Sequence, residues 1–264
     1  MNDLKVVKSN KLIRAGYKLT MNEQRLLLLG ISKLDSTRDL DSKNKVTVSA
    51  QEFSELYGIH EKTAYREVKK SVKDFAKRYL TLPSPTEKEP NREIIINWMH
   101  KTVLNPNAGT VEIYFHDDMA PYISQLKSQF TQYRLQEVAH FKSVYGVRLF
   151  EFLMQWKNKT SLAFSVDELR ACFQLEEKQY PRFFDFKKRC LIPAIRDVDS
   201  HSSFTIEDVA YTRSGKIITH IEFTFCEKGK VSQKKSNKFF DDLSAEFLED
   251  KKKPFSEDSL PLLH

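Results

Sequence analysis

Six basic side chains and one acidic side chain fall within residues 178–196, so this short segment carries a net charge of +5. Lysine binds phosphate oxygens as a point charge, whereas the planar arginine guanidinium can also bind a base edge through two hydrogen bonds. Apolar residues recur at helical spacing, which predicts one helix over residues 180–198. Its predicted buried face holds Tyr180, Phe184, Leu191, Ile195 and Val198, and its basic face holds Lys178, Arg182, Lys188 and Arg189, with Lys187 on the flank. Such a face is either a solvated surface or a surface that binds a polyanion.

The elements that must position this helix lie on both sides of it. Ser165 and Glu168 form a predicted capping box that starts a first helix after a short strand. Residues 203–211 and 216–226 alternate as two strands around a turn at 213–215, where Gly215 tolerates a positive φ. The order strand, capped helix, basic helix and hairpin is that of a winged helix-turn-helix, whose second helix enters the DNA major groove. This frame favours double-stranded DNA as the partner, with Arg213 and Lys216 of the wing as further contacts.

The same order of elements occurs once before in the chain. Residues 46–48 are a predicted strand, and Ser49 with Glu52 repeats the capping box. A long basic helix is predicted over residues 61–80, with Tyr65, Val68, Val72, Phe75 and Tyr79 on its apolar face and Lys62, Arg66, Lys69, Lys70, Lys73 and Lys77 as candidate DNA contacts. Two strands, 93–101 and 110–115, then form a second wing. The predicted fold class is therefore α+β, with two tandem winged helix-turn-helix domains.

Positive charge is concentrated on the two basic helices. Residues 62–78 carry +5, as residues 178–196 do, while the whole chain of 264 residues has a formal net charge of +7. The rest of the chain therefore carries −3. Charge focused in this way is expected of a protein that contacts DNA with two surfaces.

The remaining segments set the predicted domains. Residues 4–19 are expected to be loosely ordered, residues 20–34 to form a helix with a Thr20–Glu23 capping box, and residues 117–126 to close the first domain as a helix. Residues 130–157 are predicted as a helical pair that breaks at Gly146. The domains are then 1–128 for dimerisation and auxiliary DNA binding, 129–230 for the main sequence-specific binding, and a polar tail, 231–264. An amphipathic helix in this tail either packs on its own domain or binds a partner.

Several classes of protein are not expected from this composition. The three cysteines, Cys172, Cys190 and Cys226, are far apart and predicted as reduced core residues, so neither a disulfide framework nor a zinc ribbon is indicated. The sequence contains no phosphate loop and no His-x-His pair, and the expectation is no catalysis, no cofactor and no metal. It also has neither a long apolar run nor a secretory signal, which predicts a cytoplasmic protein without membrane contact.

Five segments, taken together and in order, carry a resemblance to a known family. They are residues 17–29 (YKLTMNEQRLLLL), 130–135 (FTQYRL), 145–153 (YGVRLFEFL), 164–170 (FSVDELR) and 185–195 (DFKKRCLIPAI). The chain resembles the initiator replication proteins of iteron-containing bacterial plasmids over about residues 5–226. Cys190, where such proteins more often have an aliphatic residue, is a small departure from the pattern.

This resemblance implies a set of functions. Tandem winged helices would bind direct repeats at an origin as a monomer, open the adjacent duplex and recruit host replication proteins. A homodimer in equilibrium with the monomer, formed largely through the first winged helix, would bind an operator inverted repeat and repress the protein's own gene. The family's recognition-helix motif would correspond to residues 185–189. Nothing is carried onto the tail after residue 230.

Two other functions fit parts of the same sequence. A transcription regulator that only binds an operator would have the same composition and fold, and only the resemblance separates it from an initiator. A structural scaffold would leave the two basic helices unexplained. Among the candidate contacts, Arg182 and Arg189 are expected to read bases, and Lys187, Lys188 and Lys216 to hold phosphates.

Overall fold

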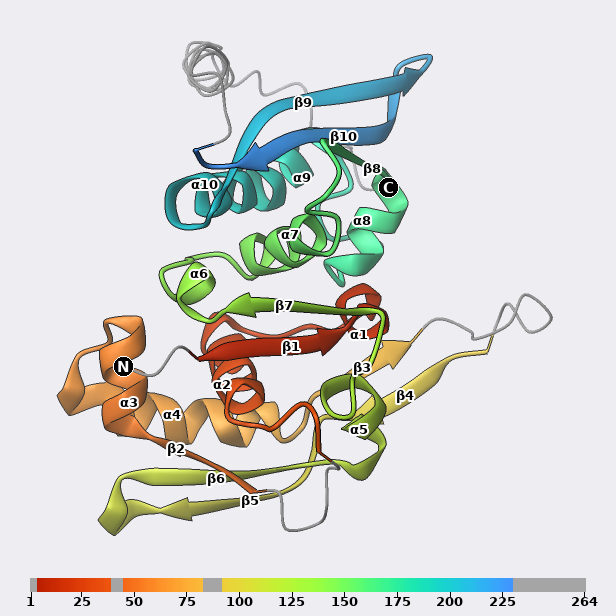
Figure 1. The fold of residues 1–264 in the computed structure, drawn as a ribbon. Coiled ribbons are helices and arrows are strands. Elements are labelled where there is room, and N and C mark those ends of the chain that lie inside the picture. The colour runs from red at the N-terminus through yellow and green to blue at the C-terminus, as the bar shows by residue number, and fades with distance from the viewer. Residues whose placement is uncertain (1–3, 39–44, 83–91, 230–264) are drawn as a thin grey trace, which may run out of the picture.

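The computed structural model describes residues 4–38, 45–82 and 92–229, and the predicted tail helix lies outside them. Two winged-helix units are stacked on either side of a central pair of strands, β1 (Lys5–Ser9) and β7 (Phe130–Arg134) (Figure 1). One continuous hydrophobic core runs through both units. In the described part of the chain, no helix is long and apolar enough to cross a membrane.

The first unit contains a three-stranded sheet, in which the predicted strand pairs with the predicted wing. Its elements are α2 (Met21–Ser32), β2 (Lys45–Ser49), α3 (Ala50–Tyr57), α4 (Glu61–Phe75), β3 (Tyr79–Leu82), β4 (Ile94–Asn97), β5 (Met99–Asn105) and β6 (Thr110–Phe115). The sheet has the order β2-β6-β5. Thr20 and Glu23 form the predicted reciprocal capping box of α2, and Gly58 ends α3 with a φ of +64°.

The second unit repeats this topology. Its elements are β8 (Ser161–Ser165), α8 (Val166–Cys172), α9 (Phe183–Phe186), a π-helical segment (Lys187–Leu191), α10 (Ile192–His201), β9 (Phe204–Ser214) and β10 (Ile217–Glu227). The sheet order, β8-β10-β9, matches that of the first unit, because in each unit the first strand pairs with the last. Two tandem winged-helix folds are thus confirmed.

The segment before α2 differs from the prediction. Residues 4–19 are well packed, with β1 followed by α1 (Asn10–Arg14), and Val6, Leu12 and Ile13 are fully buried. Strand β1 pairs with β7, which lies more than one hundred residues later in the sequence. The local pattern of a short, basic segment could not reveal that partner. The predicted domain boundary at residue 128 falls just before β7, so the two strands come from its two sides.

The connection between the units also differs from the predicted helical pair. Residues 130–134 form strand β7, and only α6 (Gln136–Ala139) and α7 (Val144–Gln155) are helical. The break lies before α7, and Gly146 is inside that helix. A Cβ at Gly146 would lie 2.8 Å from Cβ of Asp197 in α10, so this glycine permits a close helix crossing and does not end a helix.

Three boundaries in the first unit were also predicted incorrectly. Helix α4 ends at Phe75, and Tyr79, predicted on its apolar face, is 53% exposed in strand β3. The strand expected over 93–101 is split, since β4 pairs with β3 while β5 forms the wing with β6. The helix expected over 117–126 is a 3-10 turn, Asp117–Met119, followed by the short α5 (Ala120–Ile123).

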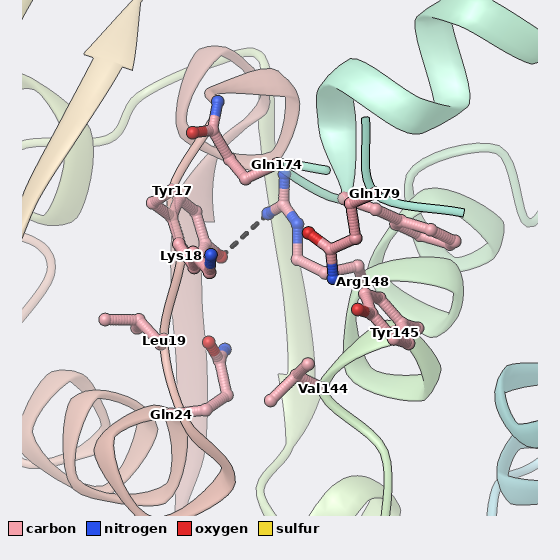
Figure 2. A pocket seen from close by; sticks show the side chains of 10 residues that line it. Tyr17, Lys18, Leu19, Gln24, Val144, Tyr145, Arg148, Gln174 and Gln179 are labelled. Carbon is pink, nitrogen blue, oxygen red and sulfur yellow. Dashed lines mark hydrogen bonds between the residues drawn. The ribbon is translucent and has the colours of Figure 1, made fainter. Parts of the chain in front are cut away.

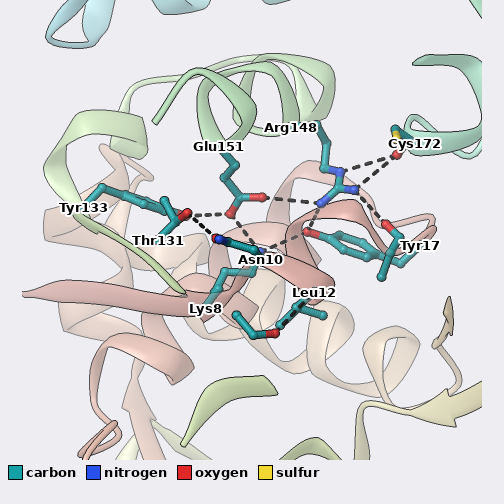
Figure 3. Close-up of polar contacts among 11 residues, drawn as sticks. Lys8, Asn10, Leu12, Tyr17, Thr131, Tyr133, Arg148, Glu151 and Cys172 are labelled. Atoms are coloured by element: carbon teal, nitrogen blue, oxygen red, sulfur yellow. Dashed lines mark hydrogen bonds and ion pairs between the residues drawn. The ribbon is translucent and has the colours of Figure 1, made fainter. Parts of the chain in front are cut away.

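A buried polar cluster connects β1 and the segment that follows it to helix α7 (Figure 3). Glu151 of α7 accepts hydrogen bonds from Lys8 of β1 at 2.7 Å and from the hydroxyl of Tyr133 in β7 at 2.7 Å. Arg148, one helical turn before Glu151, donates to the hydroxyl of Tyr17 at 2.7 Å and to the carbonyl of Ala15 at 2.7 Å. Burial opposes the charge of Lys8, but the attraction of Glu151 and Tyr17, together with the hydrogen bond to Glu151, outweighs it, and the pKa of Lys8 is raised. The strand β1 is thus tied to α7.

Candidate nucleic-acid interface

The first helix of the second unit is fixed by its capping box. Ser165 Oγ accepts the N–H of Glu168 at 3.1 Å, and Glu168 Oε2 accepts the N–H of Ser165 at 2.8 Å. The backbone and side-chain hydrogen bonds from Ser165 lower the pKa of the Glu168 carboxyl. In the first unit the same box is only half formed, because Ser49 caps Glu52 but the Glu52 carboxylate pairs with Lys33 at 2.6 Å.

Arg170 holds the turn between α8 and the basic helix. Its guanidinium donates to the carbonyl of Tyr180 at 2.9 Å and to that of Gln179 at 2.7 Å, and lies over the ring of Phe186 at 5.6 Å. Gln174 and Tyr180 have φ values of 51° and 54°, in the left-handed region that non-glycine residues rarely adopt. Tyr180 is therefore outside the helix predicted for it, and Arg170 is a positioning residue that sequence reasoning missed.

The basic helix itself is continuous from α9 through the π segment to α10, a span of 183–201. Pro193 has no N–H, so it cannot donate a hydrogen bond to the carbonyl four residues before it. The N–H of Ile192, next to it, donates to the carbonyl of Lys187, five residues back, which is the hydrogen bond of a π-helix. The wider turn rotates the preceding residues. Phe186 and Cys190 are fully buried, whereas Phe184, predicted on the buried face, is 45% exposed.

The predicted contacts of the second unit lie on its surface, and Lys187 is half-buried while the others are exposed. Lys178 precedes the helix, Arg182 is its N-cap residue, and Lys187, Lys188 and Arg189 lie in the π segment. Arg213 and Lys216 lie at the tip of the wing, where Gly215 has a φ of +59°. The helix and the wing tip belong to one unit but lie apart, with the wing projecting beyond the helices (Figure 1).

Arg182 is held by an acid on its own helix. Its Nε donates to Asp185 Oδ2 at 2.7 Å, and this hydrogen bond lowers the pKa of the Asp185 carboxyl. The bond uses only Nε, so the two terminal nitrogens keep the paired geometry that binds O6 and N7 of a guanine. Asp185 thus fixes the orientation of the Arg182 guanidinium at the start of the helix.

Three other cations of this helix lie over aromatic rings. Lys187 Nζ is 5.3 Å from the ring centroid of Tyr211, Lys188 Nζ is 5.5 Å from that of Phe184, and the Arg189 guanidinium is 5.6 Å from that of Tyr180. Such contacts are weak at exposed positions, about 0.5–1 kcal/mol each. They restrict where each cation points.

The basic helix of the first unit, α4, presents all of its predicted contacts. Val68, Val72 and Phe75 are fully buried on one side. The exposed residues on the other side are Lys62, Arg66, Lys69, Lys70 and Lys73, and the sixth predicted contact, Lys77, is exposed in the turn just after the helix. The acids nearby are only loosely paired, with Lys77 Nζ 3.8 Å from Asp74 and Arg66 Nε 3.7 Å from Glu67. The surface therefore remains strongly positive.

A small pocket lies between the segment before α2 and the turn after α8 (Figure 2). Its volume is about 100 Å³, and its lining includes Tyr17, Gln24, Arg148, Gln174 and Gln179. Gln24 Nε2 is buried there without a hydrogen-bond partner. Typical small-molecule sites have volumes of roughly 300–1,000 Å³.

The described residues include neither a cysteine with a lowered pKa nor a cluster of potential metal ligands. Burial raises the pKa of Cys172, and raises that of Cys190 and of Cys226 to about 11, so these thiols are neutral near pH 7. Among the described residues, no group of three or more His, Cys, Asp or Glu side chains is arranged to hold a metal ion.

Comparison with known families agrees with this geometry. The family model described as "Initiator Replication protein, WH1" matches residues 5–154, and the one described as "Initiator Rep protein, WH2" matches residues 165–225. The chain belongs to the initiator replication protein family. This is a family of DNA-binding initiators rather than of catalytic enzymes.

The individual relatives are distant from this chain in sequence. An Escherichia coli "Replication initiation protein" is 25% identical over 213 residues, which cover 78% of this chain and 65% of the relative. The chain thus spans a little under two thirds of that relative's length. The Escherichia coli "PI protein" is 24% identical over 251 residues, covering 84% of this chain and 82% of the relative. A crystal structure of the Pi initiator protein in complex with iteron DNA is similar in fold, with a TM-score of 0.71 and 21% identity over 87% of this chain and all of that one.

Proposed function

We propose that this protein is a plasmid replication initiator that binds direct repeats in double-stranded origin DNA through both winged-helix units. The observation that carries the proposal is the repeated topology, in which each unit exposes a basic helix that is followed along the chain by a wing. Membership of the initiator family and the fold shared with an initiator solved on iteron DNA support it. The protein acts by binding, without catalysis, a cofactor or a metal, and it works in the cytoplasm.

The two units divide this work. Residues 129–230 supply the main sequence-specific contacts, because Arg182 caps the helix and Arg189 lies in its first half, and base edges are met near the helix start. Residues 1–128 supply auxiliary phosphate contacts through the lysine-rich α4 and most of the self-association. The homodimer, in equilibrium with the monomer, binds an operator inverted repeat and represses the protein's own gene. The monomer at the origin promotes opening of the duplex and recruits host replication proteins.

DNA binding is tested with the full chain on a duplex of the repeats and on a scrambled duplex. Affinity for the repeats should fall by a factor of roughly 10³ to 10⁵ between about 50 and 200 mM salt if the protein contacts about six to ten phosphates. Sedimentation at several concentrations, with and without each duplex, measures the monomer and dimer. Affinity that does not change with salt would refute an interface built on the two basic helices.

The second candidate is a regulator that only binds an operator, and the same fold would serve it. The DNA beside the gene separates the two, since an initiator needs several direct repeats next to an A·T-rich stretch. A plasmid carrying that DNA and this gene as its sole replication functions should be maintained in a host. Repression of the promoter without plasmid maintenance would favour the regulator.

A further inference from the structure

Phe184 is an exposed aromatic residue in the first turn of the second unit's basic helix. Of the three phenylalanines in α9, Phe186 is fully buried and Phe183 packs edge-on against Tyr211 at 5.5 Å. Phe184, in contrast, is 45% exposed, and it belongs neither to the described core nor to the partly buried residues packed against it. An apolar side chain stabilises a fold through the area that it buries, so this exposed ring contributes less than a buried phenylalanine would.

The surroundings of Phe184 are those of the DNA-binding face. Lys188, one turn further along, lies over the ring with its Nζ 5.5 Å from the centroid, and Arg182 caps the same helix. The π segment before Pro193 turns this ring outward, to the side that carries the exposed cations. In a winged helix-turn-helix, residues near the start of this helix meet base edges in the major groove.

A phenyl ring can recognise only one feature of the major groove. Each base pair presents hydrogen-bond donors and acceptors there, which a hydrocarbon ring cannot satisfy, and the one apolar group is the C5-methyl of thymine. We propose that Phe184 contacts a thymine methyl in the bound duplex and thereby specifies thymine at one position of the recognised sequence. This inference rests on the proposed DNA-binding function and adds a specificity-determining residue to it.

The test uses the full chain and a duplex that this chain selects from a random library. Each thymine is replaced in turn by uracil, which keeps its base pairing and loses only the methyl group. At one position, the wild-type protein should bind the uracil duplex about fourfold more weakly than the thymine duplex. This ratio corresponds to roughly 0.8 kcal/mol, the contribution of one buried apolar carbon. Phe184→Ala should bind the thymine and uracil duplexes equally at that position. Phe184→Leu, which keeps an apolar side chain, should retain part of the difference.

A matched control is Phe130→Ala, because Phe130 is also a half-exposed phenylalanine, at 39%, but lies in strand β7. This control variant should distinguish the thymine duplex from the uracil duplex as the wild-type protein does. A melting curve of each variant shows whether it is folded. The inference is overturned if no thymine is sensitive to loss of its methyl, or if Phe184→Ala keeps the full difference, as it would if the ring were a wedge between base steps or a protein contact. Failure to select any preferred duplex would instead refute the proposed function.

Discussion

Lys8 Nζ and Glu151 Oε1 lie 2.7 Å apart, and both side chains are fully buried. The pair connects the first strand of the chain to helix α7, which leads into the second unit. A buried charge is costly unless it is paired, so removal of either partner should be far more damaging than removal of an exposed ion pair.

Lys8→Met should therefore lower the free energy of unfolding by about 3–5 kcal/mol, because it leaves the Glu151 carboxylate buried without its closest cation. Urea unfolding of the full chain measures the change. Lys18→Met is the control, since Lys18 and Glu176 form a pair of similar length, 2.8 Å, that is largely exposed. The control should change stability by less than about 1 kcal/mol. Equal losses in the two variants would argue against a structural role of the buried pair.

Gly146→Ala should destabilise the protein by about 1–3 kcal/mol through overpacking. The new Cβ would lie 2.8 Å from Cβ and Oδ2 of Asp197, whose carboxylate accepts the N–H groups of Lys142 and Ser143. An alanine in an uncrowded helix would instead stabilise it by up to about 1 kcal/mol. The sign of the change in the free energy of unfolding, measured by urea titration, shows whether α7 and α10 cross this closely.

Arg182→Ala and Arg189→Ala should relax base preference at one or two positions of the repeat, each by roughly 1–3 kcal/mol of discrimination. Alanine at Lys187, Lys188 or Lys216 should weaken all duplexes alike, because a phosphate contact carries no base information. Affinities for single-base variants of the duplex measure both effects. A uniform loss in an arginine variant, with base preference intact, would contradict the assigned roles.

Asp185→Asn should lower selectivity and raise affinity for unrelated DNA. The substitution removes the acid that orients Arg182 and one negative charge from the binding face. The ratio of affinities for selected and scrambled duplexes should fall by about tenfold, which corresponds to about 1.4 kcal/mol. An unchanged ratio would mean that Arg182 reads its base without help from this carboxylate.

Joint replacement of Lys69 and Lys73 by glutamine should weaken binding to every duplex and reduce its salt dependence by about 0.9 in log–log slope for each phosphate that is no longer neutralised. The same replacement of Lys157 and Lys159, exposed lysines outside both basic helices, is the control. The intact chain is required, since a cut after residue 128 would separate β1 from β7. A loss of base preference in the Lys69 and Lys73 variant would show that α4 also reads sequence.

Local interactions explain what could be predicted from the sequence by itself. A capping box joins residues three apart, and the Thr20–Glu23 and Ser165–Glu168 boxes both form as predicted. The strand, helix, helix and hairpin order of each unit follows from periodicities within a few residues, and so does the exposure of the basic side chains. The winged-helix folds and the surface positions of most candidate DNA-binding residues are therefore determined by short-range patterns in the sequence.

Tertiary structure determined the features that depend on contacts between residues far apart in the sequence. Strand β1 exists because β7 pairs with it, and Lys8 is charged inside the core because Glu151, 143 residues away, lies against it. Helix α4 ends early because β3 and β4 pair beyond it. Phe184 faces outward because the π segment before Pro193 shifts the helix face by part of a turn, so that Phe186 occupies the core in its place. A pattern read along the chain assumes regular helices and nearby partners, and at these positions neither assumption holds.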